Sequence, residues 1–196
     1  VEGMVMHGCY HLINTGTSWQ NFEQSDYNPV NLYAATKEAF EAILTFYTET
    51  SSLKVTTLKL FDTYGPNDSR SKIIPLLQKA FKEQKELAMS KGEQLIDLVY
   101  IDDVVDAYLI AAERHFNGQC RKNEEFVISS KNPIPLKDIV RTYEEVIGKT
   151  LPIEWGRRTY RNREVMIPWN RGVQLPNWYP KFDLKAGIMK TIFDTQ

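Results

Sequence analysis

The chain has 196 residues and a formal net charge of −1, so no excess of either charge sign favours nucleic acid or an anionic membrane surface as a partner. Two cysteines, Cys9 and Cys120, are too few for a disulfide framework, and no apolar run of about 18 residues is present. We therefore expect a cytoplasmic protein with no membrane and no nucleic-acid partner. We also expect no metal site, because no ligand spacing relates the three histidines, His7, His11 and His115.

Segments with strand-like and helix-like patterns alternate along the chain. The first eight residues resemble the tail of a helix that ends at Gly8. Short apolar runs predict strands at residues 10–14, 55–61, 95–101 and 125–129. Apolar residues at helical spacing predict one helix that ends near residue 50, and others at 73–84, 104–116, 136–147 and 184–193. Asp102 and Asp103 are expected to cap the 104–116 helix, and Asp183 the last one. The alternation indicates an α/β fold, with a parallel crossover between the first two strands.

Tyr33 and Lys37 lie four residues apart at the start of the first long helix, which places both side chains on one helical face. An ammonium near a phenol favours the phenolate and makes the tyrosine a usable proton donor or acceptor. A pair at this spacing also arises by accident. The pattern therefore leaves both a catalytic and a purely structural interpretation open.

Polar loops follow two of the predicted strands, at the end where open α/β sheets bind ligands. The first begins at Thr15, and the second covers residues 62–68. Residues 151–182 mix arginines with aromatic side chains, a composition that suits a phosphate and a stacked base or the covering of apolar surface. A nucleic-acid site has a similar local composition, but the balanced net charge favours a small nucleotide.

The order of five motifs resembles the extended short-chain dehydrogenase/reductases, which include nucleotide-sugar epimerases, dehydratases and 4-ketoreductases. The motifs are Thr15–Trp19, Tyr33-x-x-x-Lys37, Phe61–Pro66, Val99–Val104 and Leu184–Ile188. Residues 61–68 and the approach to Asp97 are similar to the CDP-linked 3,6-dideoxyhexose synthases, which reduce a 4-keto sugar. The resemblance implies NAD(P)-dependent chemistry at C4 of a nucleotide-linked sugar, as a 4-ketoreductase or a 4-epimerase.

The resemblance also implies roles for particular side chains. Tyr33 becomes the acid/base that exchanges a proton with the sugar oxygen, and Lys37 holds the nicotinamide ribose. Thr15 becomes the hydroxyl that binds the reacting oxygen, although Thr17 or Ser18 takes this place if the alignment shifts. Thr15 also suits a plain strand end.

Further contacts are implied in the same way. Phe61 and Tyr64 join Tyr33 and Lys37 in contacting the cofactor, although the turn after Tyr64 has a structural explanation of its own. The implied substrate contacts come from four side chains: Thr17, Asp62, Arg70 and Arg161. Arg161 corresponds to the arginine that grips the substrate diphosphate, whereas Arg70 also suits a solvated loop.

Three departures from the family pattern restrict the chemistry. Gly16 and Thr17 stand where family dehydratases carry Asp-Glu, so dehydration is disfavoured. Asp62 replaces a frequent substrate-binding asparagine. Ile96 replaces a frequent diphosphate-binding arginine, and both changes count against the usual UDP-sugar binding mode.

No Gly-x-Gly-x-x-Gly cradle for a dinucleotide occurs, and no two glycines are closer than Gly3 and Gly8. We therefore expect the C-terminal two-thirds of such an enzyme, inactive alone, with NAD versus NADP undecided. Residues 1–62 are expected to form part of a Rossmann-like parallel sheet. Residues 63–196 are expected to be mostly a small α/β substrate-binding lobe, from which 95–116 return to the core. An exposed sheet edge predicts that the chain either pairs with another copy, as a homodimer, or is marginally stable. The alternative is a non-catalytic fragment that binds a nucleotide sugar.

Overall fold

The structure is a computed structural model that describes residues 1–193 and divides the chain into two compact units. Unit 1 consists of residues 1–61, 104–129 and 169–179. Unit 2 consists of residues 62–103, 130–168 and the chain from 180 onward. This division differs from the predicted domains, because residues 117–129 and 169–179 belong to unit 1 and residues 95–103 to unit 2.

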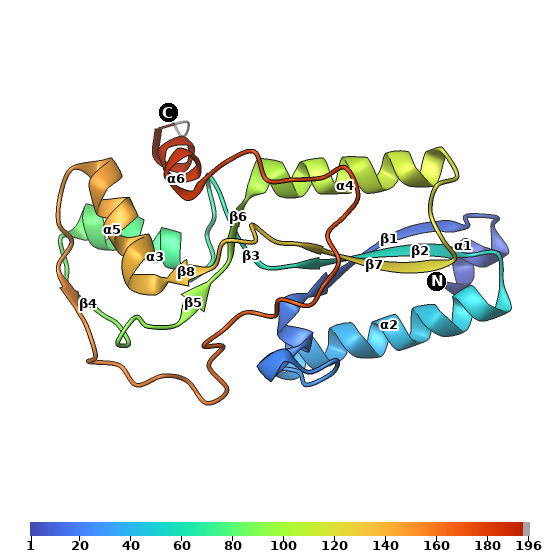
Figure 1. Cartoon of the computed structure of the whole chain (residues 1–196), viewed down its shortest axis with the longest axis horizontal. Coiled ribbons are helices and arrows are strands. Elements are labelled where there is room, and N and C mark those ends of the chain that lie inside the picture. Colours follow the sequence, from blue (N-terminus) through green and yellow to red (C-terminus); the bar gives the residue numbers. More distant parts are fainter. Residues whose placement is uncertain (194–196) are drawn as a thin grey trace. The chain divides into compact units, whose positions relative to one another are not determined.

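Unit 1 is built on a parallel sheet of three strands in the order β1-β2-β7 (Figure 1). The strands are β1 (His11–Thr17), β2 (Lys54–Leu60) and β7 (Asn123–Ile128). Thr15 pairs with Leu58, and Leu58 pairs with Phe126. The parallel crossover and the α/β class are confirmed. β1 is an edge strand, since β2 is the one strand that pairs with it among residues 1–193.

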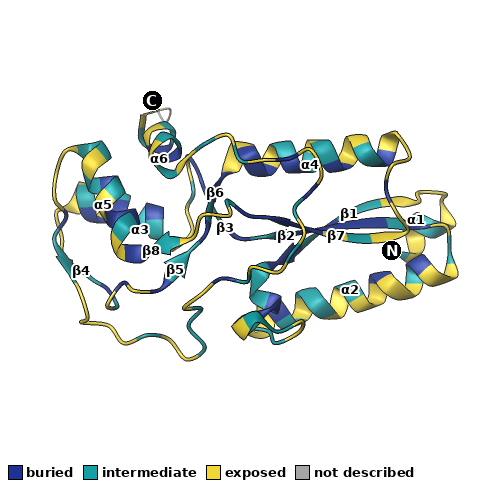
Figure 2. Cartoon of the chain, in the orientation of Figure 1, coloured by how far each residue is buried: buried dark blue, intermediate teal, exposed yellow. Residues whose placement is uncertain are grey.

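Two helices cover opposite faces of this sheet: α2 (Leu32–Thr50) and the unit-1 part of α4 (Ile101–Phe116) (Figure 1). α2 begins after Asn31, whose Oδ1 accepts a hydrogen bond from the backbone N of Ala34 at 3.0 Å. Leu44, Leu53 and Val55 pack between α2 and the sheet. Figure 2 shows buried strands between helices with exposed outer faces. The remaining elements are α1 (Glu2–Met6) and the 3₁₀ turns η1 (Ser18–Gln20) and η2 (Phe22–Gln24).

Unit 2 contains α3 (Ile73–Glu83), α5 (Leu136–Ile147) and α6 (Leu184–Phe193). Its strands form two-stranded ladders. β3 (Asp62–Tyr64) pairs parallel with β6 (Leu98–Tyr100), and β4 (Leu87–Ala88) with β9 (Ile153–Glu154). β5 (Leu95–Ile96) pairs antiparallel with β8 (Ile134–Pro135). The predicted strand 95–101 is therefore two strands, divided at the buried residue Asp97, whose carboxylate accepts a hydrogen bond from Ser130 N at 2.8 Å.

The capping role expected of Asp102 and Asp103 is wrong, because α4 already begins at Ile101 and both residues lie in its first turn. The fully buried Asp103 instead accepts hydrogen bonds from the backbone N of Lys181 at 3.0 Å and of Phe182 at 3.1 Å. Asp183 caps α6 as predicted, since its Oδ1 accepts from the backbone N of Ala186 at 2.8 Å.

Three of the five sequence motifs meet in the core of unit 2. The ring of Tyr64 packs edge-on against Tyr100, with 5.6 Å between centroids. A Cβ on Gly187 would lie 2.0 Å from the Tyr64 hydroxyl, and a Cβ on Gly65 would lie 2.4 Å from the Ile101 side chain. These glycines are therefore required by close packing between the motifs.

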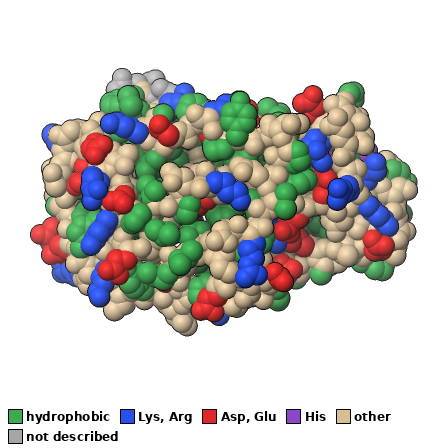
Figure 3. Space-filling view, viewed as in Figure 1, with side chains coloured by type: hydrophobic (Ala, Val, Ile, Leu, Met, Phe, Trp, Pro, Cys, Tyr) green, Lys and Arg blue, Asp and Glu red, His purple; other side chains and the backbone are tan. Residues whose placement is uncertain are grey.

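On the face shown in Figure 3, Lys and Arg side chains are interspersed with Asp and Glu, and neither sign forms a continuous patch. None of the helices in residues 1–193 combines the length and the hydropathy needed to cross a bilayer.

Candidate active site

Successive side chains of β1 point to opposite faces of the sheet, so neighbouring residues of this strand face different helices. Thr15 faces α4, where its Oγ1 lies 2.5 Å from the hydroxyl of Tyr108. Gly16 faces α2, where a Cβ would lie 2.7 Å from Glu41 Oε1 and 2.9 Å from Lys59 Cγ. A side chain at this position would therefore require Glu41 and Lys59 to shift.

Tyr33 and Lys37 lie together in the first turns of α2, with the Lys37 ammonium 5.7 Å from the centre of the Tyr33 ring. The Tyr33 side chain is 53% exposed and is available to a ligand. Burial raises the pKa of Tyr108, the nearby Tyr33 adds to this effect, and the bond with Thr15 opposes it. Tyr33 is thus near enough to the Thr15–Tyr108 pair to act on it electrostatically.

Thr17 has a different environment from Thr15. Its hydroxyl accepts a hydrogen bond from the backbone N of Trp19 at 3.3 Å, and its own backbone N donates to Gln20 Oε1 at 2.8 Å. These reciprocal bonds form a capping box at the start of η1. The Thr17 hydroxyl is therefore engaged in holding the loop, which favours Thr15 as the hydroxyl for a substrate.

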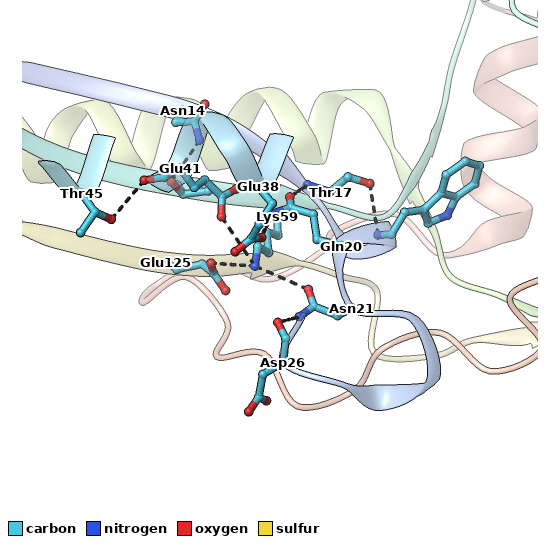
Figure 4. A network of polar contacts seen from close by, with 12 residues as sticks. Asn14, Thr17, Gln20, Asn21, Asp26, Glu38, Glu41, Thr45, Lys59 and Glu125 are labelled. Atoms are coloured by element: carbon cyan, nitrogen blue, oxygen red, sulfur yellow. Dashed lines mark hydrogen bonds and ion pairs between the residues drawn. The ribbon is translucent and has the colours of Figure 1, made fainter. Parts of the chain in front are cut away.

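A buried charge network supports the loop after β1 from the α2 side of the sheet (Figure 4). Lys59 of β2 is 4% exposed, and its ammonium lies 2.8 Å from Glu125 and 3.8 Å from Glu41. The same ammonium contacts Asn21 Oδ1 at 3.5 Å. Gln20 Nε2 completes the network by donating to Glu38 at 2.6 Å. Both 3₁₀ turns are thereby tied to α2 and β2.

Glu41 is the member of this network whose ionised form is disfavoured. Burial raises the pKa of its carboxyl from 4.5 to about 7, although Lys59 and Gln20 both act to lower it. The desolvation cost of the carboxylate therefore exceeds what the long contact with Lys59 returns. Glu41 also lies four residues after Lys37 on α2, one turn further along the same helical face.

The predicted substrate residues of unit 2 have partners within that unit. Arg70 makes a bidentate ion pair with Asp68, at 2.8 Å for both Nε and Nη2. Asp62 pairs with Lys72 at 2.7 Å. Arg161 is 80% exposed and lies 3.6 Å from Glu164.

The predicted cofactor residues Phe61 and Tyr64 are buried. Phe61 is 8% exposed at the end of the first segment of unit 1. Tyr64 is 2% exposed in the core of unit 2, where its hydroxyl donates to the carbonyl of Leu184 at 3.4 Å. Burial raises the pKa of Tyr64, with further increases from Asp183 and Asp103. The Tyr64 side chain is committed to packing, so a cofactor contact here would have to come from the loop backbone.

Sequence reasoning missed Tyr108 and Lys59. Tyr108 occupies an ordinary helical position, 93 residues from Thr15, and nothing in its local pattern marks it. Lys59 left a detectable signal, because a lysine inside an otherwise apolar strand segment needs a buried partner.

The parallel sheet with its crossover helix, and the tyrosine–lysine pair beside the end of its edge strand, define a Rossmann-like α/β protein. The model of the NAD dependent epimerase/dehydratase family matches residues 12–129, more than half of the chain, and the chain belongs to this family. The family expected from the sequence is thus confirmed.

Known relatives agree with this assignment. The chain is 34% identical over 159 residues to a CDP-abequose synthase of Yersinia pseudotuberculosis, covering 80% of this chain and 54% of the synthase. A UDP-glucose 4-epimerase of Thermotoga maritima solved with UDP-glucose superposes with a TM-score of 0.83 at 22% identity, over 99% of this chain and 65% of the epimerase. A UDP-glucose 4-epimerase of Stenotrophomonas maltophila, solved with NAD and formylated UDP-arabinopyranose, superposes with a TM-score of 0.84 at 14% identity. This match covers 97% of this chain and 64% of the epimerase. The chain thus spans less than two thirds of each of these proteins.

Proposed function

We propose that this chain carries the proton-transfer and sugar-binding groups of an NAD(P)-dependent enzyme acting at C4 of a nucleotide-linked sugar, as a 4-ketoreductase or a 4-epimerase. The observation that carries the proposal is the cluster of Tyr33, Lys37 and Thr15 beside the end of β1. The similarity to a CDP-abequose synthase supports the reductase, and the similarity to UDP-glucose 4-epimerases supports the epimerase.

The proposed chemistry uses the hydroxyl groups of this chain. Tyr33 exchanges a proton with the C4 oxygen, and Thr15 donates a hydrogen bond to the same oxygen. Tyr108 donates to Thr15, which leaves the Thr15 proton free for the substrate. The Lys37 ammonium stabilises the Tyr33 phenolate after its proton has left. A bound nicotinamide supplies or accepts the hydride.

The described residues fit one end of the cofactor. The exposed Tyr33 and the neighbouring Lys37 suit a nicotinamide ribose, whereas no glycine-rich cradle for a pyrophosphate occurs in the 196 residues. Calorimetry of NAD against residues 1–196 should therefore show weak binding. Tight binding by these residues alone would contradict this account.

The catalytic role is tested in the active polypeptide that contains these residues. Tyr33→Phe should lower turnover by at least about 100-fold, the usual contribution of a positioned acid/base, while nucleotide-sugar affinity stays within a few fold. Tyr27→Phe is the matched control, because Tyr27 is 54% exposed and lies outside the cluster. Full turnover of the Tyr33 variant would exclude Tyr33 as the group that exchanges the proton.

The two reactions differ in their use of the cofactor. A reductase consumes one NADPH or NADH per CDP-linked 4-keto sugar. An epimerase interconverts two nucleotide sugars with bound NAD and no net redox change. Measuring cofactor absorbance during complete conversion of the sugar distinguishes them.

We also propose that the protein is a homodimer that pairs through α2. Large apolar side chains on this helix are open to solvent, with Leu32 79%, Ile43 50% and Phe46 61% exposed. Light scattering of the double variant Ile43→Lys/Phe46→Lys should show a monomer where the wild type is a dimer. Phe116→Lys, at a 91% exposed position of α4, should leave the dimer intact.

A further inference from the structure

Two histidines and a cysteine that are far apart in the sequence meet in unit 1. His11 begins β1, His115 lies near the end of α4, and Cys120 follows in the loop before β7. The Nδ1 atoms of the two histidines are 2.9 Å apart, and Cys120 Sγ lies 3.3 Å from His115 Nδ1. One possible ligand atom from each of the three residues lies within 4.8 Å of the others.

The hydrogen bonds around His115 determine which of its nitrogens carries a lone pair. The Thr56 hydroxyl donates its single proton to Glu124 Oε1 at 2.9 Å, and Glu124 also pairs with Arg114 at 3.1 Å. Thr56 Oγ1 must then accept the hydrogen bond that joins it to His115 Nε2 at 2.9 Å. The proton of the neutral ring therefore sits on Nε2, and the lone pair of Nδ1 points at His11 and Cys120.

This arrangement is the one that metal-binding histidines use. A ligating imidazole presents one nitrogen to the ion and donates its other N–H to an oxygen that is itself anchored. Thr56 and Glu124 provide that anchored chain, and both are held by β2 and β7.

Two of the three separations between the donor atoms are close to those around a small tetrahedral ion, and the third, between His11 and Cys120, is within 4.8 Å. Zn–N bonds of about 2.0–2.1 Å and a Zn–S bond of about 2.3 Å place tetrahedral nitrogen pairs about 3.3 Å apart and nitrogen–sulfur pairs about 3.6 Å apart. The separations of 2.9 and 3.3 Å need to widen by only a few tenths of an ångström. His11 and His115 also border a depression of about 480 Å³, which leaves room for a fourth ligand from solvent.

We propose that His11, His115 and Cys120 form a Zn²⁺ site, with both Nδ1 atoms and the thiolate as ligands and a solvent-derived fourth ligand. On binding, Cys120 releases its thiol proton to solvent. The proton that His11 Nδ1 donates to His115 Nδ1 in the metal-free chain leaves this nitrogen, and the neutral His11 ring then carries its proton on Nε2, taken up from solvent. The ion joins the start of the edge strand β1 to the loop after α4. The sequence-based expectation of no metal site rested on local spacing, whereas His11 and His115 are 104 residues apart.

The test uses the full chain without a histidine tag, freed of metal by a chelator. Zn²⁺ titration in competition with a chromophoric chelator should give one ion per chain. Co²⁺ should give the intense visible bands of a tetrahedral ion together with a thiolate-to-cobalt charge-transfer band in the near ultraviolet. Zn²⁺ should also raise the unfolding temperature of the chain.

Matched variants assign the ligands. Loss of a hydrogen-bond partner of a ligand typically weakens metal binding by roughly 10–100-fold, and His11→Ala and Cys120→Ala, which remove ligands, should each weaken Zn²⁺ binding by more than this. Cys120→Ala should also remove the charge-transfer band. Thr56→Val should weaken binding by roughly 10–100-fold and keep that band. The exposed residues His7 and Cys9 lie outside the cluster, so His7→Ala and Cys9→Ala should bind as the wild type does.

The exposed position of His11 makes its variant informative even if a change at the buried Cys120 disturbs folding. The proposal is overturned by any one of three results. These are no Zn²⁺ binding by the wild type, a cobalt spectrum without the thiolate band, or Zn²⁺ affinity that survives His11→Ala.

Discussion

Replacing Glu41 by glutamine should stabilise the protein at alkaline pH and change its stability little in acid. Glutamine has nearly the shape of the protonated carboxyl and cannot ionise. The pKa of Glu41 in the folded chain is about 7, against 4.5 without the surrounding protein. Between these two values the folded state binds more protons than the unfolded state, so folding stability falls as pH rises through this window.

The size of the effect follows from the two pKa values. Ionising Glu41 costs the folded state about 1 kcal/mol at pH 5 and about 3 kcal/mol at pH 8, and the cost is complete above the folded pKa. The variant avoids this cost. Its stability relative to the wild type should therefore increase by about 2 kcal/mol between the two pH values. The attraction of Lys59 is already contained in the pKa, and Lys59 keeps its closer partner Glu125.

Urea unfolding followed by circular dichroism at several pH values between 5 and 8 measures this difference. Glu49→Gln on the same helix is the control, because Glu49 is exposed in a surface ion pair with Lys122 and its loss should change stability by less than about 1 kcal/mol. A wild-type-to-variant difference that stays constant from pH 5 to pH 8 would refute the assignment of Glu41 as a costly buried carboxyl.

Three further changes test the packing and the site. Gly187→Ala should destabilise the chain by about 1–3 kcal/mol in urea unfolding, because its Cβ would collide with the buried Tyr64 hydroxyl; unchanged stability would show that α6 shifts freely. Lys59→Met should lower the free energy of unfolding by about 3 kcal/mol at pH 8. The loss should be smaller at pH 5, where its buried partner Glu41 takes up a proton; an equal loss at both pH values would contradict this. Tyr108→Phe should lower kcat of the active polypeptide about fivefold and leave KM unchanged, because the variant loses one neutral hydrogen bond to Thr15. A change in KM alone would mean that Tyr108 does not act through Thr15.

Local pattern was sufficient for much of the fold. The helices at 136–147 and 184–193 have the bounds expected from apolar spacing and from their terminal residues Gly148 and Asp183. β1 extends to Thr17, beyond the predicted end at residue 14, because the polar residues that follow continue the backbone pairing with β2. The length of a strand depends on its pairing with a neighbouring strand, and the residue pattern of one strand alone holds no information about that neighbour.

The candidate site was only partly accessible from the sequence. Tyr33 and Lys37 are neighbours through helical geometry, so their spacing was enough. The Thr15–Tyr108 contact and the His11–His115 contact join residues 93 and 104 positions apart, and only the folded chain brings them together. The glycine motifs at residues 65 and 187 were informative about ancestry, yet their physical role is close packing inside unit 2.

The edge position of β1 among the described residues has a consequence for how this chain opens on heating. β1 holds Thr15 against Tyr108, but among the described residues β2 alone pairs with this strand. Edge elements open locally at a lower free energy than the whole domain. Fraying of β1 would separate the two hydroxyl groups while β2 and β7 remain paired. In this chain, separation of Thr15 from Tyr108 on heating should then precede the cooperative loss of secondary structure, and ligands that bridge β1 to its neighbours should narrow the interval between the two.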